Sequence, residues 1–205
     1  MQAVSKTALW VASMRATEAA RPDRLHGDDP LAVAVVASAP SIPAAPPGAA
    51  EFMAVRTRFY DDFLADGPAQ VVVLAAGLDA RAFRLPWPPG ARVFELDLPE
   101  LLTFKEELIA ATAVVAACTR VVVPIDLRDD WPTALIGAGF SPALPTAWIA
   151  EGLLQYLGEP DKKRLLDTIA GLSAPGSRFA FDHMDASADH RASVADALDR
   201  IRSMG

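Results

Sequence analysis

Gly77 and Asp97 are the two residues whose types and spacing point most directly to chemistry. Gly77 follows a short β-branched run, Val71 to Ala75, and Asp97 follows a second run, Arg92 to Leu96, twenty positions after Gly77. In a parallel sheet, a glycine turn lets the backbone approach a ligand, and an acid about 20 residues later accepts hydrogen bonds from a ribose diol. The spacing therefore predicts an adenosine site.

The residues around Gly77 narrow the kind of adenosine ligand. A dinucleotide fingerprint has three glycines, whereas Ala75, Ala76, Leu78 and Asp79 surround the single glycine here. Asp79 also places a negative charge where a pyrophosphate requires free N–H groups. An NAD-dependent oxidoreductase is therefore a less favoured alternative. S-adenosylmethionine, which has no phosphate, is the favoured cofactor.

Two further acids follow strands of the predicted sheet. A third strand, Arg120 to Ile125, ends at Asp126, and a fourth, Thr146 to Ala150, is followed by Glu151. Asp126 has two readings, a loop cap or an acceptor for an adenine amino group with the Leu127 backbone at the ring edge. Its register with the acid of the second strand favours the adenine reading. Glu151 is expected to face an ammonium or sulfonium group of the cofactor.

Six segments resemble the leucine carboxyl methyltransferase family, and in particular its mycobacterial S-adenosylmethionine-dependent methyltransferases. They are 19–23, 55–59, 73–88, 94–99, 123–128 and 150–154. The resemblance implies transfer of a methyl group to a carboxylate or hydroxyl oxygen of a small molecule, and it does not identify the acceptor. Three features depart from the family pattern: Ala75 replaces a usual glycine, the segment between Ala37 and Glu51 is short, and the chain stops early.

Arg56 lies on a predicted helix, Glu51 to about Ala65, in which Phe52, Val55, Phe59 and Phe63 are expected to form a buried stripe. One reading pairs Arg56 with Asp62 or Glu51 in a salt bridge. The other, which the family resemblance supports and which we favour, is a bidentate clamp on the methionine carboxylate of the cofactor.

The order of predicted elements indicates a doubly wound α/β sheet, Rossmann-like and of the class I methyltransferase type, with strand order 3-2-1-4-5. We expect one domain with a helical cap over 1–66, a cofactor-binding core over 67–184 and a helical tail over 185–205. The proline-rich connector 39–48 reads as a surface loop or, less favoured, as a substrate lid.

The C-terminal part is expected to be shortened. The family resemblance implies two more strands after the fifth, Arg178 to Asp182, whereas Asp185 to Gly205 reads as a tail with one helix, 193–204. Strands 6 and 7 would then be missing, and Phe179 to Phe181 would form an exposed edge prone to self-association. A truncated remnant that binds cofactor without turnover is therefore an alternative function.

No catalytic residue is assigned. His183 is either a general base or a structural histidine, and Tyr156 either lines the substrate side or belongs to the core. No Ser/His/Asp arrangement is evident, and no Cys/His cluster has metal-ligand spacing, so we expect no metal.

Composition sets the broad class. The chain has 205 residues, of which 52% are hydrophobic and 22% charged, and a net charge of −7. These values indicate one globular domain and argue against nucleic-acid binding, which needs a basic surface. A single cysteine fits a reducing compartment, and no run approaches the ~20 apolar residues of a membrane span. We expect a cytoplasmic protein without membrane contacts.

Overall fold

A computed structural model describes residues 6–38, 42, 48–112 and 114–182, and the structural statements below concern these residues. The strands are β1 Gln70–Leu74, β2 Arg92–Asp97, β3 Thr119–Pro124, β4 Thr146–Ala150 and β5 Arg178–Phe181. The helices are α1 Lys6–Ala19, α2 Pro30–Ser38, α3 Ala49–Ala65, α4 Arg81–Arg84, α5 Pro99–Thr112, α6 Trp131–Gly137, the 3₁₀ turn η1 Leu154–Tyr156 and α7 Glu159–Gly171.

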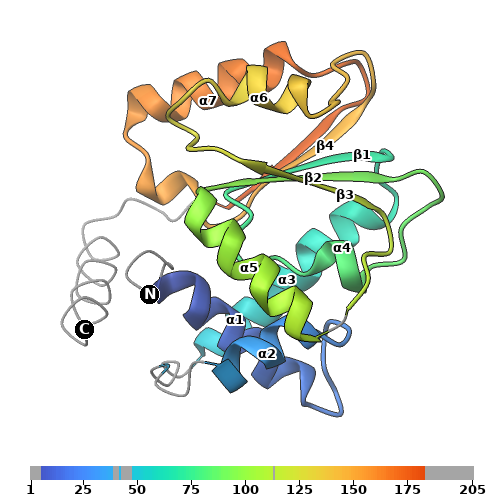
Figure 1. Cartoon of the computed structure of the whole chain (residues 1–205), viewed down its shortest axis with the longest axis vertical. Coiled ribbons are helices and arrows are strands. Elements are labelled where there is room, and N and C mark those ends of the chain that lie inside the picture. Colours follow the sequence, from blue (N-terminus) through green and yellow to red (C-terminus); the bar gives the residue numbers. More distant parts are fainter. Residues whose placement is uncertain (1–5, 39–41, 43–47, 113, 183–205) are drawn as a thin grey trace.

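The described strands form one parallel sheet in the order β3-β2-β1-β4-β5, which confirms the predicted α/β fold and strand order. Figure 1 shows α6 and α7 on one face of this sheet, with α3, α4 and α5 on the other. The carboxyl ends of all five strands share one edge because the strands are parallel. Residues that follow β1, β2, β3 and β4 are therefore brought together there.

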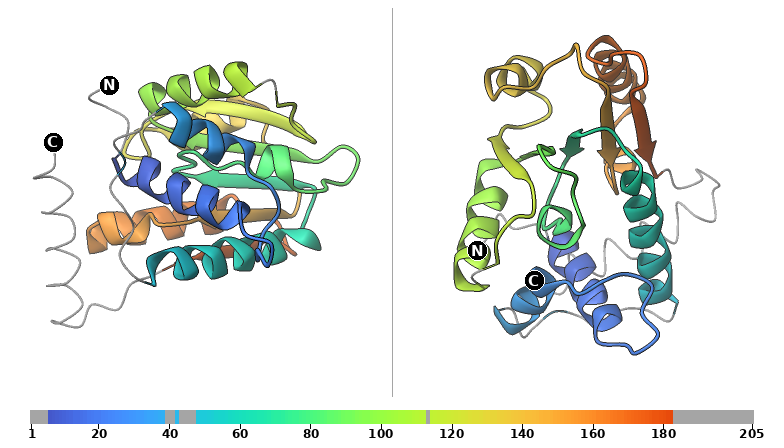
Figure 2. Two further views of the ribbon diagram at one scale, coloured as in Figure 1. Left: turned by 90° about the horizontal axis from the view of Figure 1, so that it is seen from below. Right: turned by 90° about the vertical axis from the view of Figure 1, so that its right-hand side faces the viewer.

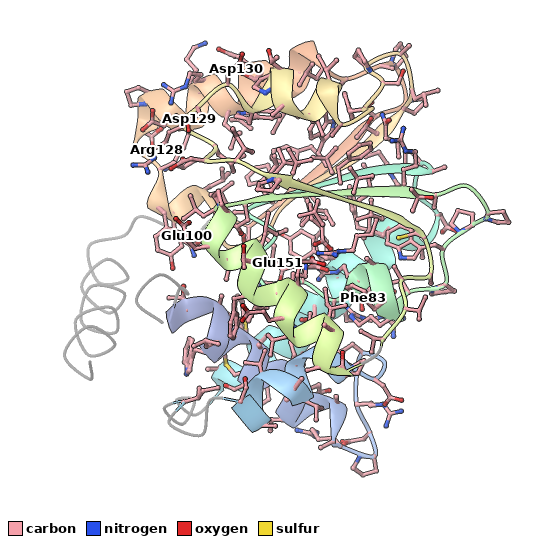
Figure 3. All side chains as sticks on the ribbon, in the orientation of Figure 1. Phe83, Glu100, Arg128, Asp129, Asp130 and Glu151 are labelled. Atoms are coloured by element: carbon pink, nitrogen blue, oxygen red, sulfur yellow. The ribbon has the colours of Figure 1, made fainter. Side chains whose placement is uncertain are left out.

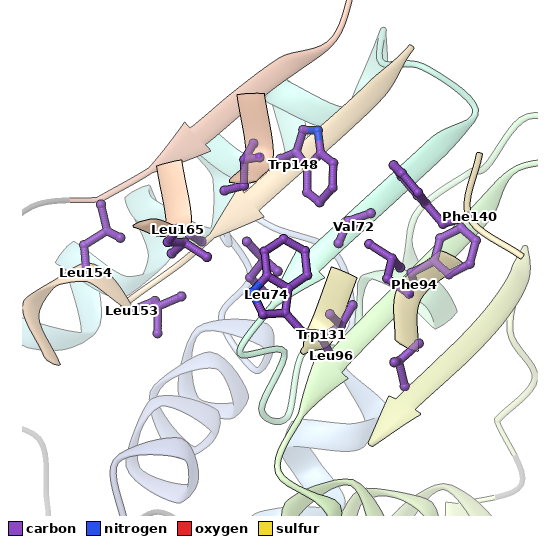
Figure 4. Packing of buried hydrophobic residues seen from close by; sticks show 14 residues of the cluster. Val72, Leu74, Phe94, Leu96, Trp131, Phe140, Trp148, Leu153, Leu154 and Leu165 are labelled. Atoms are coloured by element: carbon purple, nitrogen blue, oxygen red, sulfur yellow. The ribbon is translucent and has the colours of Figure 1, made fainter. Parts of the chain in front are cut away.

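The largest cluster of buried hydrophobic residues lies between the sheet and α6 and α7. β1 and β4 are buried along their whole length, as expected for central parallel strands covered on both faces. Figure 4 shows Val72 and Leu74 of β1 packed with Trp131, Trp148 and Leu165, which come from α6, β4 and α7. The rigid sheet fixes the strand ends that carry the candidate site.

Helices α1 and α2 form a further layer beyond α3 and α5, on the side away from α6 and α7 (Figure 2). Asp29 precedes α2, and its Oδ1 accepts a hydrogen bond from the Ala32 N–H at 2.8 Å. Its other oxygen accepts from Arg15 Nε at 2.8 Å, which ties α1 to α2. Arg15 also donates to the Leu78 carbonyl at 2.6 Å, so the helical layer contacts the turn that follows β1.

The predicted buried stripe of α3 is wrong. Phe52, Val55 and Phe59 are exposed, and only Phe63 is partly buried. The buried face consists instead of Ala54, Thr57, Tyr60, Asp61 and Leu64. This face is partly polar because it packs on buried arginine side chains of α4, and the apolar pattern could not reveal those partners.

Some expectations fall outside the described residues. They concern His183, most of the connector 39–48, and the tail helix with its missing strands. Within the described ranges, no helix is both long enough and apolar enough to cross a membrane.

Candidate functional site

Asp97 and Gly77 meet directly at the ends of β2 and β1. One carboxylate oxygen of Asp97 accepts a hydrogen bond from the Gly77 N–H at 2.6 Å, and the other accepts from the Leu98 N–H at 2.7 Å. Burial raises the pKa of Asp97, and the two backbone donors oppose that rise only in part. The carboxylate is thus held in one orientation beside the turn.

The turn itself has unusual backbone geometry. Gly77 has a φ of 50°, in the left-handed region that glycine adopts without penalty. Ala75 has a φ of 51°, in the same region, where a Cβ atom is strained. Ala75 is the position at which the family resemblance implies glycine, and the local geometry explains that preference.

A cavity of about 350 Å³ opens at this edge of the sheet. Its lining includes Asp97, Asp126 and Leu127, and the indole of Trp131 forms part of its wall. Tyr156 also lines it and is exposed, so the core reading of this tyrosine is wrong. The cavity brings together the two acids that were expected to contact an adenosine.

Asp126 is both a loop cap and a cavity residue. It accepts a hydrogen bond from the Arg128 N–H at 2.9 Å, and the Arg128 guanidinium pairs with both its oxygens. Hydrogen bonds from the Arg128 side chain and backbone lower the pKa of Asp126. Figure 3 shows Arg128, Asp129 and Asp130 together near α7, at the periphery of the molecule. Asp126 is therefore ionised at neutral pH and accessible from solvent.

A buried ionic cluster lies at the same carboxyl edge of the sheet, on the α3 side. It comprises Arg56, Asp61, Asp79, Arg81, Arg84, Glu151 and Asp182. Arg81 is its centre, because its side chain is only 4% exposed and contacts three carboxylates. Arg81 Nε donates to Asp61 Oδ1 at 2.9 Å and Nη1 donates to Glu151 Oε2 at 2.8 Å, while Nη1 also pairs with Asp79. Arg84 makes a bidentate pair with Asp61, with both distances 2.6 Å.

Arg56 joins α3 to the ends of β4 and β5. Its Nε lies 3.0 Å from Glu151 Oε1, and its Nη1 donates to Asp182 Oδ2 at 3.0 Å. The predicted alternative, a salt bridge with Asp62 or Glu51, is wrong; Asp62 pairs with Arg58. Gly152 lies directly beneath, since a Cβ atom there would stand 3.5 Å from Arg56 Nη1.

Positive charges of the cluster favour the ionised forms of Glu151 and Asp79. Burial alone would raise the pKa of Glu151, but Arg81 and then Arg56 lower it below the ordinary value. Burial opposes ionisation of Asp79 in the same way, and Arg81, followed by Lys105, lowers its pKa to about 2. Figure 3 shows Glu151 in the middle of the molecule, between the sheet and the N-terminal helices. An ionised, partly buried carboxylate there suits a cationic ligand group.

Sequence reasoning missed Arg81, Asp61 and Asp182. Asp182 accepts a hydrogen bond from the Gly152 N–H at 2.5 Å, which links β5 to the turn after β4. Its place as the last residue of the predicted fifth strand, 178–182, was the available signal. Arg81 and Asp61 carried no such signal, because Asp61 and Glu151 lie 20 and 70 positions from Arg81 in the sequence.

Proteins of similar sequence indicate the family of this chain. The sequence model described as leucine carboxyl methyltransferase matches residues 8–170. A protein of Parafrankia sp. named "putative S-adenosyl-L-methionine-dependent methyltransferase" is 49% identical over 195 residues, which cover 87% of this chain and 63% of that protein. A Saccharopolyspora erythraea protein of the same name is 49% identical over 193 residues, covering 87% and 67%. The chain thus spans about two thirds of the length of these relatives.

A solved structure supports the fold. The crystal structure of a protein from Thermobifida fusca, titled as a putative methyltransferase, superposes with a TM-score of 0.56 at 22% identity. The superposition covers 92% of this chain and 70% of that one.

Proposed function

Because the chain belongs to the leucine carboxyl methyltransferase family, we propose that it binds S-adenosylmethionine and transfers its methyl group to an oxygen of a small molecule. The observation that carries the proposal is the cavity lined by Asp97, Asp126 and Leu127, with the ionic cluster at the same edge of the sheet. The cavity offers acceptors for an adenosine, and the cluster offers groups of both charges for an amino-acid zwitterion.

The adenosine half would occupy the cavity. Asp97 would accept hydrogen bonds from the ribose hydroxyls, Asp126 from the adenine amino group, and the Leu127 backbone would meet the ring edge. Gly77 supports this placement, because a glycine has no side chain that would keep the ligand away from the backbone of the turn.

The methionine half of the cofactor would form ion pairs with residues of the ionic cluster, in place of ion pairs that these residues make with one another. Arg56 would turn its guanidinium fork to the cofactor carboxylate, and Glu151 would accept the ammonium in place of Arg56. Arg56 on α3 and Glu151 after β4 already lie side by side, with Arg56 Nε 3.0 Å from Glu151 Oε1, so little reorganisation is needed. The hydroxyl of Tyr60 supports a polar ligand at this end, since it is buried and has no hydrogen-bond partner among the described residues.

The bound cofactor supplies a methyl group already activated on a sulfonium. The protein therefore has chiefly to align the acceptor and exclude water. A carboxylate acceptor would need no general base, whereas a hydroxyl acceptor must lose a proton during transfer. No described residue is assigned as that base, and both acceptor classes stay open.

Dinucleotide binding is less well supported. The N–H of Arg81, at the start of α4, already donates to Asp79 Oδ1 at 2.7 Å and is not free for a pyrophosphate. Helix α4 has only four residues, so it offers a weak dipole. Titration with NAD in parallel with S-adenosylmethionine separates the two cofactors.

Calorimetric titration with S-adenosylmethionine tests the proposal, with Asp97→Ala as the decisive variant. We expect Asp97→Ala to weaken binding by about 2 kcal/mol, because a buried ribose diol would lose its acceptor. Asp167→Ala removes an exposed acid of α7 that pairs with Lys163 and should leave the affinity unchanged. Equal affinity in the wild type and Asp97→Ala would contradict the assignment of Asp97.

A methyl-transfer assay with candidate carboxylate and hydroxyl acceptors tests turnover separately. Binding without turnover would favour the alternative function, a cofactor-binding chain that does not catalyse transfer.

A further inference from the structure

Asp182 is a carboxylate for which the proposed function gives no role. It directly follows β5, and both its oxygens are engaged, one by Arg56 and one by the Gly152 N–H. Its side chain is 24% exposed, whereas those of Arg56 and Glu151 are 12% and 15% exposed. Within the ionic cluster, Asp182 is thus the acid most open to a ligand.

The ionic cluster carries more negative than positive charge. Four carboxylates, of Asp61, Asp79, Glu151 and Asp182, face the three guanidinium groups of Arg56, Arg81 and Arg84. Charged neighbours among the described residues pair with one another: Arg15 with Asp29, and Lys105 and Arg120 with Glu95 and Glu106. One carboxylate of the cluster is therefore in excess.

Tyr60 gives a second, independent sign of a ligand at this end. Its side chain is buried, and its hydroxyl has no hydrogen-bond partner among the described residues. Burial, and then the charges of Asp182 and Glu151, raise the pKa of Tyr60 well above its ordinary value. The hydroxyl thus stays a neutral donor close to the two acids, available to a polar ligand atom.

We propose that Asp182 makes this site favour S-adenosylmethionine over its product, S-adenosylhomocysteine. The inference rests on the proposed function. If Arg56 and Glu151 pair with the carboxylate and ammonium of the cofactor, the sulfonium is the one positive charge left over. The excess carboxylate, Asp182, balances it.

The same charge balance favours product release. During transfer, an electron pair of the acceptor oxygen forms the new C–O bond, and the pair of the broken C–S bond stays on sulfur. The sulfonium becomes a neutral thioether, and a hydroxyl acceptor additionally loses its proton to solvent. Asp182 then faces no compensating charge, which weakens binding of the product relative to the substrate.

Three ligands separate the charge effect from the shape effect. S-adenosylmethionine carries a sulfonium, sinefungin carries an amine at the corresponding position, and S-adenosylhomocysteine carries a neutral thioether there. In Asp182→Asn, the side-chain oxygen can still accept from the Gly152 N–H, so the variant removes charge with little change in shape. We expect the two cationic ligands to bind about fivefold to tenfold more weakly in titration calorimetry, the size expected for one unit charge nearby in a partly solvated site. S-adenosylhomocysteine should change by less than about twofold.

Controls keep the inference testable. Asp167→Asn removes an exposed acid of α7 and should alter none of the three affinities. If Asp182→Asn does not fold, the wild type still tests the idea, since raising salt from about 0.01 M to about 1 M should reduce its preference for the cationic ligands.

Two results would overturn the inference while leaving the proposed function intact. One is an equal loss of affinity for all three ligands in Asp182→Asn, which would assign Asp182 a structural role only. The other is unchanged affinities in that variant. Failure of the wild type to bind any of the three ligands would overturn the proposed function itself, and this inference with it.

Discussion

At the scale of single residues, the three acids that follow β2, β3 and β4 differ in what holds them. Asp97 is held by backbone N–H groups, Asp126 by the exposed Arg128, and Glu151 by two buried arginines. In the proposed complex, Asp97 would use its remaining lone pairs for the neutral ribose hydroxyls, whereas Glu151 would exchange a guanidinium partner for the cofactor ammonium. The three carboxylates would therefore serve different ligand groups because their surroundings differ.

Arg56→Lys should change ligand preference more than overall affinity. Lysine keeps the positive charge but lacks the planar fork that matches a carboxylate. We expect titration calorimetry to show weaker binding of S-adenosylmethionine, by about 1 to 2 kcal/mol. Decarboxylated S-adenosylmethionine, which lacks the matching group, should bind the variant and the wild type alike. Equal weakening of both ligands would rule out the clamp.

Ala75→Gly should stabilise the protein. Ala75 is held at a φ of 51°, where an L residue is strained and glycine is not. We expect the free energy of unfolding, measured by urea denaturation, to rise by about 0.5 to 1 kcal/mol. Ala76→Gly, at the adjacent position without a positive φ, should instead lower it by a similar amount. A loss of stability in both variants would show that Ala75 is not strained.

At the scale of elements, the strands were predictable and the packing of α3 was not. Strands such as β1 and β4 are apolar throughout because helices cover both faces, and their sequences show it directly. In α3, the buried face includes Asp61 because Arg81 and Arg84 lie opposite it. A prediction from hydrophobic periodicity assumes that the buried face of a helix is apolar. The prediction is wrong where that face contains ion pairs, as in α3.

The same limit applies to the candidate site. The positions of Asp97, Asp126 and Glu151 at strand ends followed from the strands alone. The ion pairs of Arg56 required the end of β5 and the turn after β4 to be placed in space. Whether these residues bind the cofactor stays a prediction, as does self-association through the edge of β5.

Paired substitutions on α3 test its orientation. Phe59→Ala removes an exposed ring and should change the free energy of unfolding by less than about 0.5 kcal/mol. Tyr60→Ala removes a neighbouring ring that is 1% exposed and should cost about 3 kcal/mol or more. Denaturant unfolding of the two variants measures both values. The reverse ranking would restore the stripe predicted from the sequence.

At the scale of the whole molecule, the ionic cluster links stability to pH. The pKa of Asp79 is about 2 in the folded protein, against an ordinary value of 3.8. Because the folded value is the lower one, its contribution is present above pH 4 and is lost as the pH falls toward 2. The lowered pKa values of Asp29 and Glu151 act in the same direction, and the raised pKa of Asp97 acts in the opposite one.

We therefore expect the free energy of unfolding to fall by about 2 kcal/mol from Asp79 alone between pH 4 and pH 2. Urea denaturation at a series of pH values measures this fall. Asp167→Asn, at an exposed ion pair, should leave the slope nearly unchanged, whereas Asp79→Asn should flatten it. A flat profile in the wild type would contradict the shift assigned to Asp79.

The strand order also affects how the nascent chain folds during synthesis. β1 ends at Leu74 and pairs on one side with β2, which begins at Arg92, but its other neighbour is β4, which begins only at Thr146. Once β1, β2 and β3 have left the ribosome, they can form a three-stranded sheet in which β1 is an unpaired edge, in addition to the edge at β3. The edge at β1 is apolar and lacks its cover until β4 emerges, so the interval between β3 and β4 is when the nascent chain is most exposed to aggregation and most in need of a chaperone.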